Sequence, residues 1–222
     1  MRYNGGKHSI RKELAAIFNS YKPSKYWEPF VGAGSVINEV VAEYKLGTDL
    51  DVSIISLINA VKNGWQPPET LSEEEYREAK KLPETDPVHG FAKYGCSFGG
   101  KPWGGYARSA DRNYAKNAKN SLLKDRKRYL TAEFKVAGYQ DIDYRDFDLI
   151  YCDPPYRGTT SVGCGKPFDH DDFWYWVRKI SKHATVFVTE LQAPEGFEVV
   201  WEKQLNDGLG KTKIKERLFK IK

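Results

Sequence analysis

The chain has 222 residues, a formal net charge of +5, and 40% hydrophobic and 29% charged residues. Its three cysteines include no CxxC pair, so neither a disulfide framework nor a zinc site is indicated, and no apolar run approaches the roughly 20 residues of a membrane span. The start at Met1 does not read as a signal peptide, so we expect a soluble protein of a reducing compartment. The length suits one domain with a sizeable insertion, and the mild positive charge permits a nucleic-acid partner.

The first part of the chain alternates strand and helix patterns. Residues 26–31 predict a short strand, residues 32–35 a tight loop, and residues 36–44 a helix, because apolar side chains recur there at helical spacing. A second strand ends at Asp49, and residues 52–61 predict another helix. This β-α-β-α order is typical of a parallel sheet covered by helices.

The sheet pattern breaks after residue 65 and resumes near residue 131, so residues 66–130 predict an insertion. A helix should begin after Ser72, because a serine cap precedes acids in the first turn. Residues 93–128 hold ten Lys or Arg against two Asp, a net charge of +8, which leaves −3 for the rest of the chain. The positive charge is therefore concentrated in the insertion.

The second part of the chain supplies the remaining elements of the sheet. We predict strands at 133–136, 147–152 and 185–189, a helix at 169–182, and a closing antiparallel pair at 197–201 and 214–221. The fold class that follows is α/β: a Rossmann-like sheet that is mostly parallel, with closing antiparallel strands and an inserted region.

A rigid bend ends the strand at 147–152. Asp153 is followed by Pro154 and Pro155, which lack a backbone N–H and fix φ near roughly −65°, and then by Tyr156. The Asp153 carboxylate, the Pro154 carbonyl and the Tyr156 ring are thereby held with little freedom, as a site for a planar polar group requires. A purely structural turn is the alternative.

The loop Gly32-Ala33-Gly34 lies between a predicted strand and a predicted helix, where open α/β sheets bind ligands. It lacks the third glycine of the dinucleotide fingerprint. Asp49, at the tip of the next strand, is placed to take the two hydroxyls of a ribose, or else to cap the following helix. This pattern fits any cofactor that contains adenosine.

The stretch 94–108 interleaves four aromatic residues with five glycines, a lysine and an arginine. We interpret it as poor core material and as a nucleic-acid contact, because aromatic rings stack on bases and cations meet phosphates. A solvated helix face is the alternative for residues 116–128. The candidate DNA-binding residues are Lys101, Trp103, Tyr106, Arg108, Arg112 and Lys116.

Two motifs together resemble a known family. "EPFVGAGSV" at 28–36 and "DPPY" at 153–156 look like the DNA N6-adenine methyltransferases of the Dam type, and "YNGGK" at 3–7 is similar to their N-terminal cofactor motif. The order is also that of the family: glycine motif, target-recognition insertion, then DPPY. "GCSFGGKPWGGYAR" and "FDHDDFW" add a likeness to the short adenine methylases of phages and prophages.

The resemblance implies a cofactor, S-adenosylmethionine, and residues that hold it. Lys7 would lie near the methionine carboxylate with Tyr3 nearby, Asp49 would hold the ribose, and the turn with Gly138 and Tyr139 would contact the adenine ring. The full set of implied cofactor-binding residues is Tyr3, Lys7, Glu28, Phe30, Gly32, Gly34, Asp49, Gly138, Tyr139 and Asp153.

The resemblance also implies the organisation and the partner. Residues 1–65 and 131–222 would form the catalytic domain, and residues 66–130 would recognise the target in double-stranded DNA. The enzyme would act without a metal, as a monomer or weak dimer, in the cytoplasm of a prokaryotic host cell, and it would be of phage or prophage origin.

The implied reaction accounts for the bend at 153–156. Adenine N6 is a poor nucleophile because its lone pair is delocalised into the ring. If Asp153 and the Pro154 carbonyl each accept one N–H, the lone pair turns toward the methyl group, and Tyr156 offers a face for the flipped-out base. The loop 157–167 would order over that base, or would be a plain solvent loop. Phe168 would form another wall of the base pocket, or would pack in the core.

Other functions stay open at this point. Cytosine N4 presents the same geometry to the same bend, RNA could replace DNA as the substrate, and a protein that binds DNA without turnover is a third alternative. A nicotinamide oxidoreductase is disfavoured, because the third glycine and a proton-relay pair near the crevice are both missing.

Overall fold

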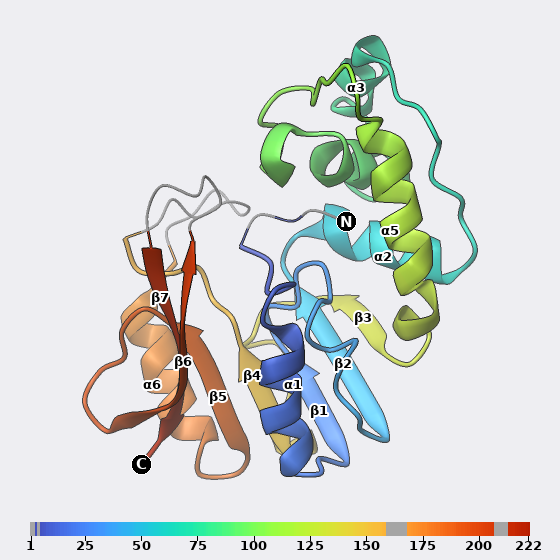
Figure 1. Ribbon diagram of the computed structural model, residues 1–222. Coiled ribbons are helices and arrows are strands. Elements are labelled where there is room, and N and C mark those ends of the chain that lie inside the picture. Colours follow the sequence, from blue (N-terminus) through green and yellow to red (C-terminus); the bar gives the residue numbers. More distant parts are fainter. Residues whose placement is uncertain (1–2, 4, 159–167, 207–212) are drawn as a thin grey trace.

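The computed structural model describes residues 3, 5–158, 168–206 and 213–222 of the chain (Figure 1). Its seven-stranded sheet has the order β3-β2-β1-β4-β5-β7-β6. The strands are β1 Lys25–Glu28, β2 Tyr44–Asp49, β3 Glu133–Val136, β4 Leu149–Cys152, β5 Thr185–Glu190, β6 Phe197–Asn206 and β7 Lys213–Ile221. The first five strands pair in parallel, and β7 is antiparallel to both β5 and β6. The predicted fold class, mostly parallel with a closing antiparallel pair, is confirmed.

Helices cover both faces of this sheet. The α-helices are α1 Arg11–Ser20, α2 Val52–Lys62, α3 Glu73–Ala79, α4 Pro87–Gly90, α5 Tyr114–Tyr129 and α6 His170–Ile180, with single turns at Phe91–Gly95, Phe98–Gly100 and Tyr144–Asp146. One buried cluster joins α1 and α2 to one face of the sheet, and a second cluster packs α6 on the other face. Within the described residues, no helix combines the length and apolar character of a membrane span.

The helix predicted at residues 36–44 is wrong. The chain forms turns there, and Tyr44 already begins β2. Its apolar side chains are nevertheless buried, including Val36 and Val40. Asn19 of α1 bonds two main-chain groups that would pair within a helix. Its side chain accepts from the Val41 N–H at 2.9 Å and donates to the Glu39 carbonyl at 3.3 Å. Tertiary hydrogen bonds therefore replace helical ones.

The insertion folds onto α2. Its first helix, α3, has the predicted Ser72 cap, which forms a reciprocal capping box with Glu75. Gly90 allows a close approach: a Cβ atom there would lie 2.4 Å from the Ser53 carbonyl oxygen of α2. Residues of the insertion, among them Phe91 and Leu122, share one buried cluster with α2. In Figure 1 the insertion stands over the end of the sheet from which α2 begins.

The Gly90 contact gives a stability prediction. Gly90→Ala should lower the free energy of unfolding by about 1–3 kcal/mol, because the methyl group overpacks against main-chain atoms that cannot move independently. Thermal unfolding measures the effect. Asn117→Ala, on the exposed side of α5, is the matched control and should leave the melting temperature nearly unchanged. Equal melting temperatures for the two variants would contradict this account of the packing.

Candidate active site

The carboxyl ends of four adjacent parallel strands bring polar residues to one edge of the sheet. In spatial order, β2 ends at Asp49, β1 leads into the glycine loop, β4 leads into Asp153, and β5 ends at Glu190. Ligands of open α/β sheets bind at this edge because the loops after neighbouring strands diverge there and leave a crevice.

The glycine loop is fastened to the end of β2. The Gly32 N–H donates to Asp49 Oδ2 at 2.9 Å, and the Asp51 N–H donates to Asp49 Oδ1 at 3.0 Å. Gly32 and Gly34 have positive φ values of 47° and 69°, and a Cβ atom on Gly32 would lie 2.9 Å from the Tyr3 ring. Asp51, rather than Asp49, caps α2. Burial raises the pKa of Asp49 to about 6, against the lowering effect of the N–H donors.

Aromatic rings form a wall around Phe30, which lies just before the glycine loop. The Phe30 ring centroid lies 5.7 Å from that of Tyr139 and 5.8 Å from that of Phe168. The Tyr139 hydroxyl donates to Asp172 at 2.8 Å, and the Gly138 N–H donates to Asp141 at 2.8 Å, which closes the predicted turn. The structure thus brings Phe30 and Tyr139, which were predicted for the cofactor, together with Phe168, which was predicted for the base pocket or the core.

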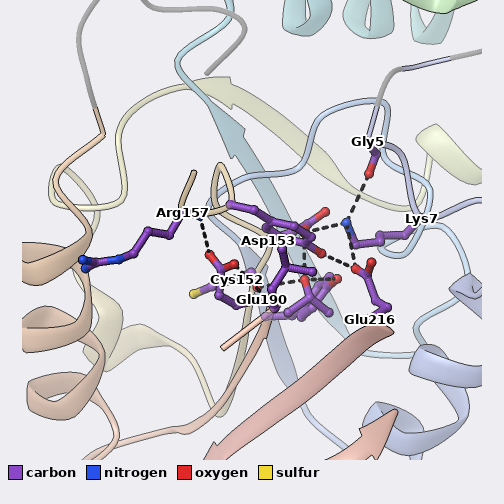
Figure 2. Close-up of polar contacts among 11 residues, drawn as sticks. Gly5, Lys7, Cys152, Asp153, Arg157, Glu190 and Glu216 are labelled. Carbon is purple, nitrogen blue, oxygen red and sulfur yellow. Dashed lines mark hydrogen bonds and ion pairs between the residues drawn. The ribbon is translucent and has the colours of Figure 1, made fainter. Parts of the chain in front are cut away.

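Asp153 lies at the centre of a buried polar cluster (Figure 2). Its Oδ1 accepts from the Thr189 hydroxyl at 2.7 Å and is 2.7 Å from the Lys7 ammonium, and its side chain is 18% exposed. Burial raises the pKa of Asp153, while the Lys7 ammonium opposes that rise. Burial alone would lower the pKa of Lys7, but the carboxylates of Asp153 and Glu216 hold it above its ordinary value.

Tyr156 belongs to the same cluster. Its hydroxyl donates to Glu216 of β7, and the Lys7 ammonium lies 4.9 Å from its ring centroid. The Lys7 ammonium is also 3.3 Å from Glu216 Oε1. The ring is half-buried, so part of it remains open to a ligand. The predicted residues Lys7, Asp153 and Tyr156 are therefore in direct contact.

Residues 3–92 match the family described as D12 class N6 adenine-specific DNA methyltransferase. The match confirms the resemblance seen in the motifs, and it supports an enzyme that transfers methyl groups. It includes Tyr3, Lys7, the glycine loop and Asp49, and it ends before the Asp153 turn, which the fold itself places beside that segment.

Solved structures with a similar fold include three methyltransferase-type proteins. They are a "putative RNA methyltransferase" from Pyrococcus horikoshii (12% identity, 96% of this chain and 81% of that chain, TM-score 0.45), a "putative methyltransferase" from Escherichia coli (9%, 96% and 86%, 0.42) and a "putative methylase" from Haemophilus influenzae (14%, 96% and 88%, 0.39). No curated protein matches the chain.

Three residues of the candidate site were not predicted from the sequence: Thr189, Glu190 and Glu216. Glu190 accepts from the Leu191 and Arg157 N–H groups at 2.8 and 3.3 Å, and burial raises its pKa to about 7. An acid at a strand tip was a detectable signal for Glu190, as it was for Asp49. Glu216 gave no such signal, because its place depends on how β7 pairs with β5.

Glu28, a predicted cofactor residue, is buried within β1 and accepts from the Tyr26 hydroxyl at 2.6 Å. Burial raises its pKa to about 8. Its carboxyl group therefore lies beneath the strand ends, and its part in cofactor binding stays a prediction.

The candidate DNA-binding residues all lie on the insertion but differ in environment. Lys101 and Arg112 are exposed, Arg108 pairs with Glu73, and Lys116 lies 3.9 Å from Glu69. Trp103 is half-buried, with its ring centroid 5.3 Å from that of Tyr76, and the Tyr106 hydroxyl donates to the Leu71 carbonyl at 2.5 Å.

The expectation that the stretch 94–108 is poor core material is wrong. Tyr94, Cys96 and Ala107 are buried. The segment folds back on itself, with the Ala107 N–H donating to the Cys96 carbonyl at 2.9 Å and the Phe98 N–H to the Gly105 carbonyl at 2.8 Å. Its glycines permit this reversal, which turns most of the aromatic rings inward and leaves Phe98 63% exposed.

Lys93, counted in the basic segment, is also buried. Its ammonium lies 2.9 Å from Asp51 and 3.2 Å from the Ser53 hydroxyl, and the Tyr94 hydroxyl donates to the same Asp51 carboxylate. The Tyr94 ring centroid is 5.1 Å from that of Tyr3, which covers Gly32. This part of the insertion therefore contacts the glycine-loop region, and Lys93 is not exposed. Of the predicted loop over the base, at 157–167, residues 159–167 lie outside the described residues.

The buried Glu28 carboxyl gives a pH prediction. Its folded-state pKa, about 8, exceeds its ordinary value of 4.5, so folding favours the protonated form. Its contribution is fully present below about pH 4.5 and is lost as the pH rises through 8. Glu28→Gln removes this dependence, so its stability relative to wild type should increase between pH 5 and 8, by up to about 4 kcal/mol.

Chemical denaturation at several pH values measures this difference. Glu202 is an exposed partner of Lys215, and Glu202→Gln is the control. Its free energy of unfolding should differ from that of wild type by a small amount at every pH. A constant difference between Glu28→Gln and wild type from pH 5 to 8 would show that Glu28 titrates normally.

Proposed function

We propose that this chain transfers a methyl group from S-adenosylmethionine to the N6 amine of an adenine flipped out of double-stranded DNA. The observation that carries the proposal is the Asp153-Pro154-Pro155-Tyr156 turn at the end of the central strand β4, directly beside the glycine loop that follows β1. The family match over residues 3–92 supports it from an independent part of the chain.

The residues at the strand ends fit S-adenosylmethionine. Gly32 and Gly34 adopt conformations that side chains disfavour, so the backbone there can approach a ligand closely. The Asp49 carboxylate is held by two main-chain donors and would accept from the ribose hydroxyls. Phe30 and Tyr139 provide the apolar wall for an adenine ring. When bound, this cofactor would supply the electrophilic methyl group.

Lys7 would contact both the cofactor and the Asp153 carboxylate. Its ammonium is already 2.7 Å from Asp153 at the crevice, where the carboxylate of the cofactor's methionine part would be a further anionic partner. Such a placement suits a lysine better than an arginine, because a compact ammonium can share its three donors among several oxygens.

The chemistry at N6 depends on two acceptors in fixed positions. The Asp153 carboxylate and the Pro154 carbonyl would each accept one amine hydrogen, so that negative potential faces the nitrogen as it becomes positive. Thr189 and Lys7 hold the carboxylate from the sides, and the two prolines restrict the carbonyl. Tyr156 would stack on the adenine ring and align it for in-line attack. The methyl group would leave the cofactor sulfur, which becomes a thioether as the C–N bond forms, and the methylated amine would then pass its extra proton to water.

The insertion would hold the DNA. Lys101, Arg112 and Lys116 are exposed cations suited to phosphates, and Arg108 would exchange its partner Glu73 for one. Trp103 and Tyr106 would shape the loop that carries Lys101, since both rings are half-buried within the insertion. A cavity of about 290 Å³, lined in part by Tyr106, Arg108 and Arg112, opens on this region.

The reaction is tested by transfer of labelled methyl from S-adenosylmethionine to unmethylated DNA, followed by mass spectrometry of the nucleosides. N6-methyladenine is expected. Asp153→Ala should reduce the rate by about 10²–10³-fold or more, because it removes one acceptor at the reacting nitrogen, while cofactor affinity should change little. Asp143→Ala, an exposed acid paired with Arg145, is the control and should retain full activity. If the product is N4-methylcytosine, the target base is cytosine and not adenine.

DNA contact by the insertion is tested through the salt dependence of binding. Lys101→Ala and Arg108→Ala should each weaken binding to any sequence and flatten the plot of log affinity against log salt by about 0.9 per lost phosphate contact. Lys81→Ala, an exposed lysine of the same insertion paired with Glu78, is the control. If all three variants keep the wild-type slope, the basic surface of the insertion is only a solvated face.

A further inference from the structure

Glu216 is a buried acid that the sheet topology brings to the reacting end of the molecule. Strand β7 runs antiparallel to β5 and pairs Arg217 with Glu190, so Glu216 lies beside the carboxyl end of β5. Side chains alternate along a strand, and Glu216 therefore points to the same face as Leu218, which packs in the cluster with α1. Lys7, just before α1, is on that face.

Its contacts connect two residues of the proposed reaction. Glu216 Oε1 accepts from the Tyr156 hydroxyl and lies 3.3 Å from the Lys7 ammonium, which in turn pairs with Asp153 at 2.7 Å. Figure 2 shows Lys7, Asp153 and Glu216 pointing toward one another, with Glu216 coming from the strand drawn below them. Its side chain is 8% exposed, so the carboxylate depends on these partners rather than on water.

A buried carboxylate that is not needed should be replaceable by a well-packed apolar residue at little cost. Here the carboxylate does two things that an apolar residue could not do. It anchors the hydroxyl end of the Tyr156 ring, and it is a second anionic partner, beside Asp153, for the Lys7 ammonium, which also donates to the Gly5 carbonyl at 3.1 Å. Both effects act on groups that would touch the adenine.

We propose that Glu216 is a positioning residue for methyl transfer. It holds the stacking ring of Tyr156 in place, and together with Asp153 it binds the Lys7 ammonium. The assignment rests on the proposed function. It gives the closing antiparallel strand a direct part in the site, in addition to completing the sheet.

The charge of Glu216 should affect the ionisation of Asp153. Its negative charge raises the pKa of Asp153, which the Lys7 ammonium lowers. Other titratable groups near Asp153 are Glu28, Tyr151, Cys152, Tyr156 and Glu190. Since Asp153 must be ionised to accept an amine hydrogen, the acid limb of kcat/KM against pH follows its pKa. Removing only the Glu216 charge should move that limb to lower pH.

The experiment compares Glu216→Gln, Glu216→Ala and wild type. Glu216→Gln keeps an acceptor for the Tyr156 hydroxyl but loses the charge, so its acid limb should shift down by roughly half a pH unit or more. Glu216→Ala also frees the ring, and kcat should fall by about 10- to 100-fold. Glu202→Gln, on the exposed side of the same hairpin, is the control and should match wild type in both.

A second measurement does not depend on turnover. The carbon-13 signal of the Asp153 carboxyl group, assigned by its loss in Asp153→Asn, should titrate at lower pH in Glu216→Gln than in wild type. An unchanged titration overturns the assignment of Glu216, whether or not methyl is transferred. Loss of thermal stability with unchanged kcat and pH profile also overturns it, since Glu216 would then be only structural. Absence of methyl transfer by wild type instead overturns the proposed function, while the titration still tests Glu216.

Discussion

The buried ammonium of Lys7 is the interaction on which the active site depends. A lysine that is 9% exposed is tolerated only beside carboxylates, and Asp153 and Glu216 supply them at 2.7 and 3.3 Å. The three residues come from the segment before α1, from the turn after β4 and from β7. One charge cluster therefore joins parts of the chain that are distant in sequence, and it fixes the acid that would meet the amine.

A second buried pair connects the insertion to the same edge of the sheet. Lys93 and Tyr94 reach Asp51, which caps α2 and donates its own N–H to Asp49. The region proposed to hold DNA is thus built against the region proposed to hold the cofactor. Its close packing at Gly90 makes that connection rigid, because no space separates the two backbones.

Local sequence patterns and long-range contacts decide different parts of this fold. The strand positions to within a few residues, α2 and the Ser72 cap follow from local patterns, because each pattern reflects contacts within a few residues. The helix expected at 36–44 failed since Asn19, far away in sequence, provides the hydrogen bonds of that segment. The aromatic residues at 94–108 were misread for a similar reason: a chain reversal through glycines buries rings that look exposed in the sequence.

The sequence by itself determined the α/β class, the order of the elements and the resemblance that led to Lys7, Asp49, Asp153 and Tyr156, because motifs and periodicity are local properties of the chain. Only the tertiary structure decided that Lys7 pairs with Asp153 and that Glu216 joins them. Those contacts depend on the register between β5 and β7 and on the path of the chain before α1. Both depend on the packing of the whole sheet, which no short stretch of sequence specifies.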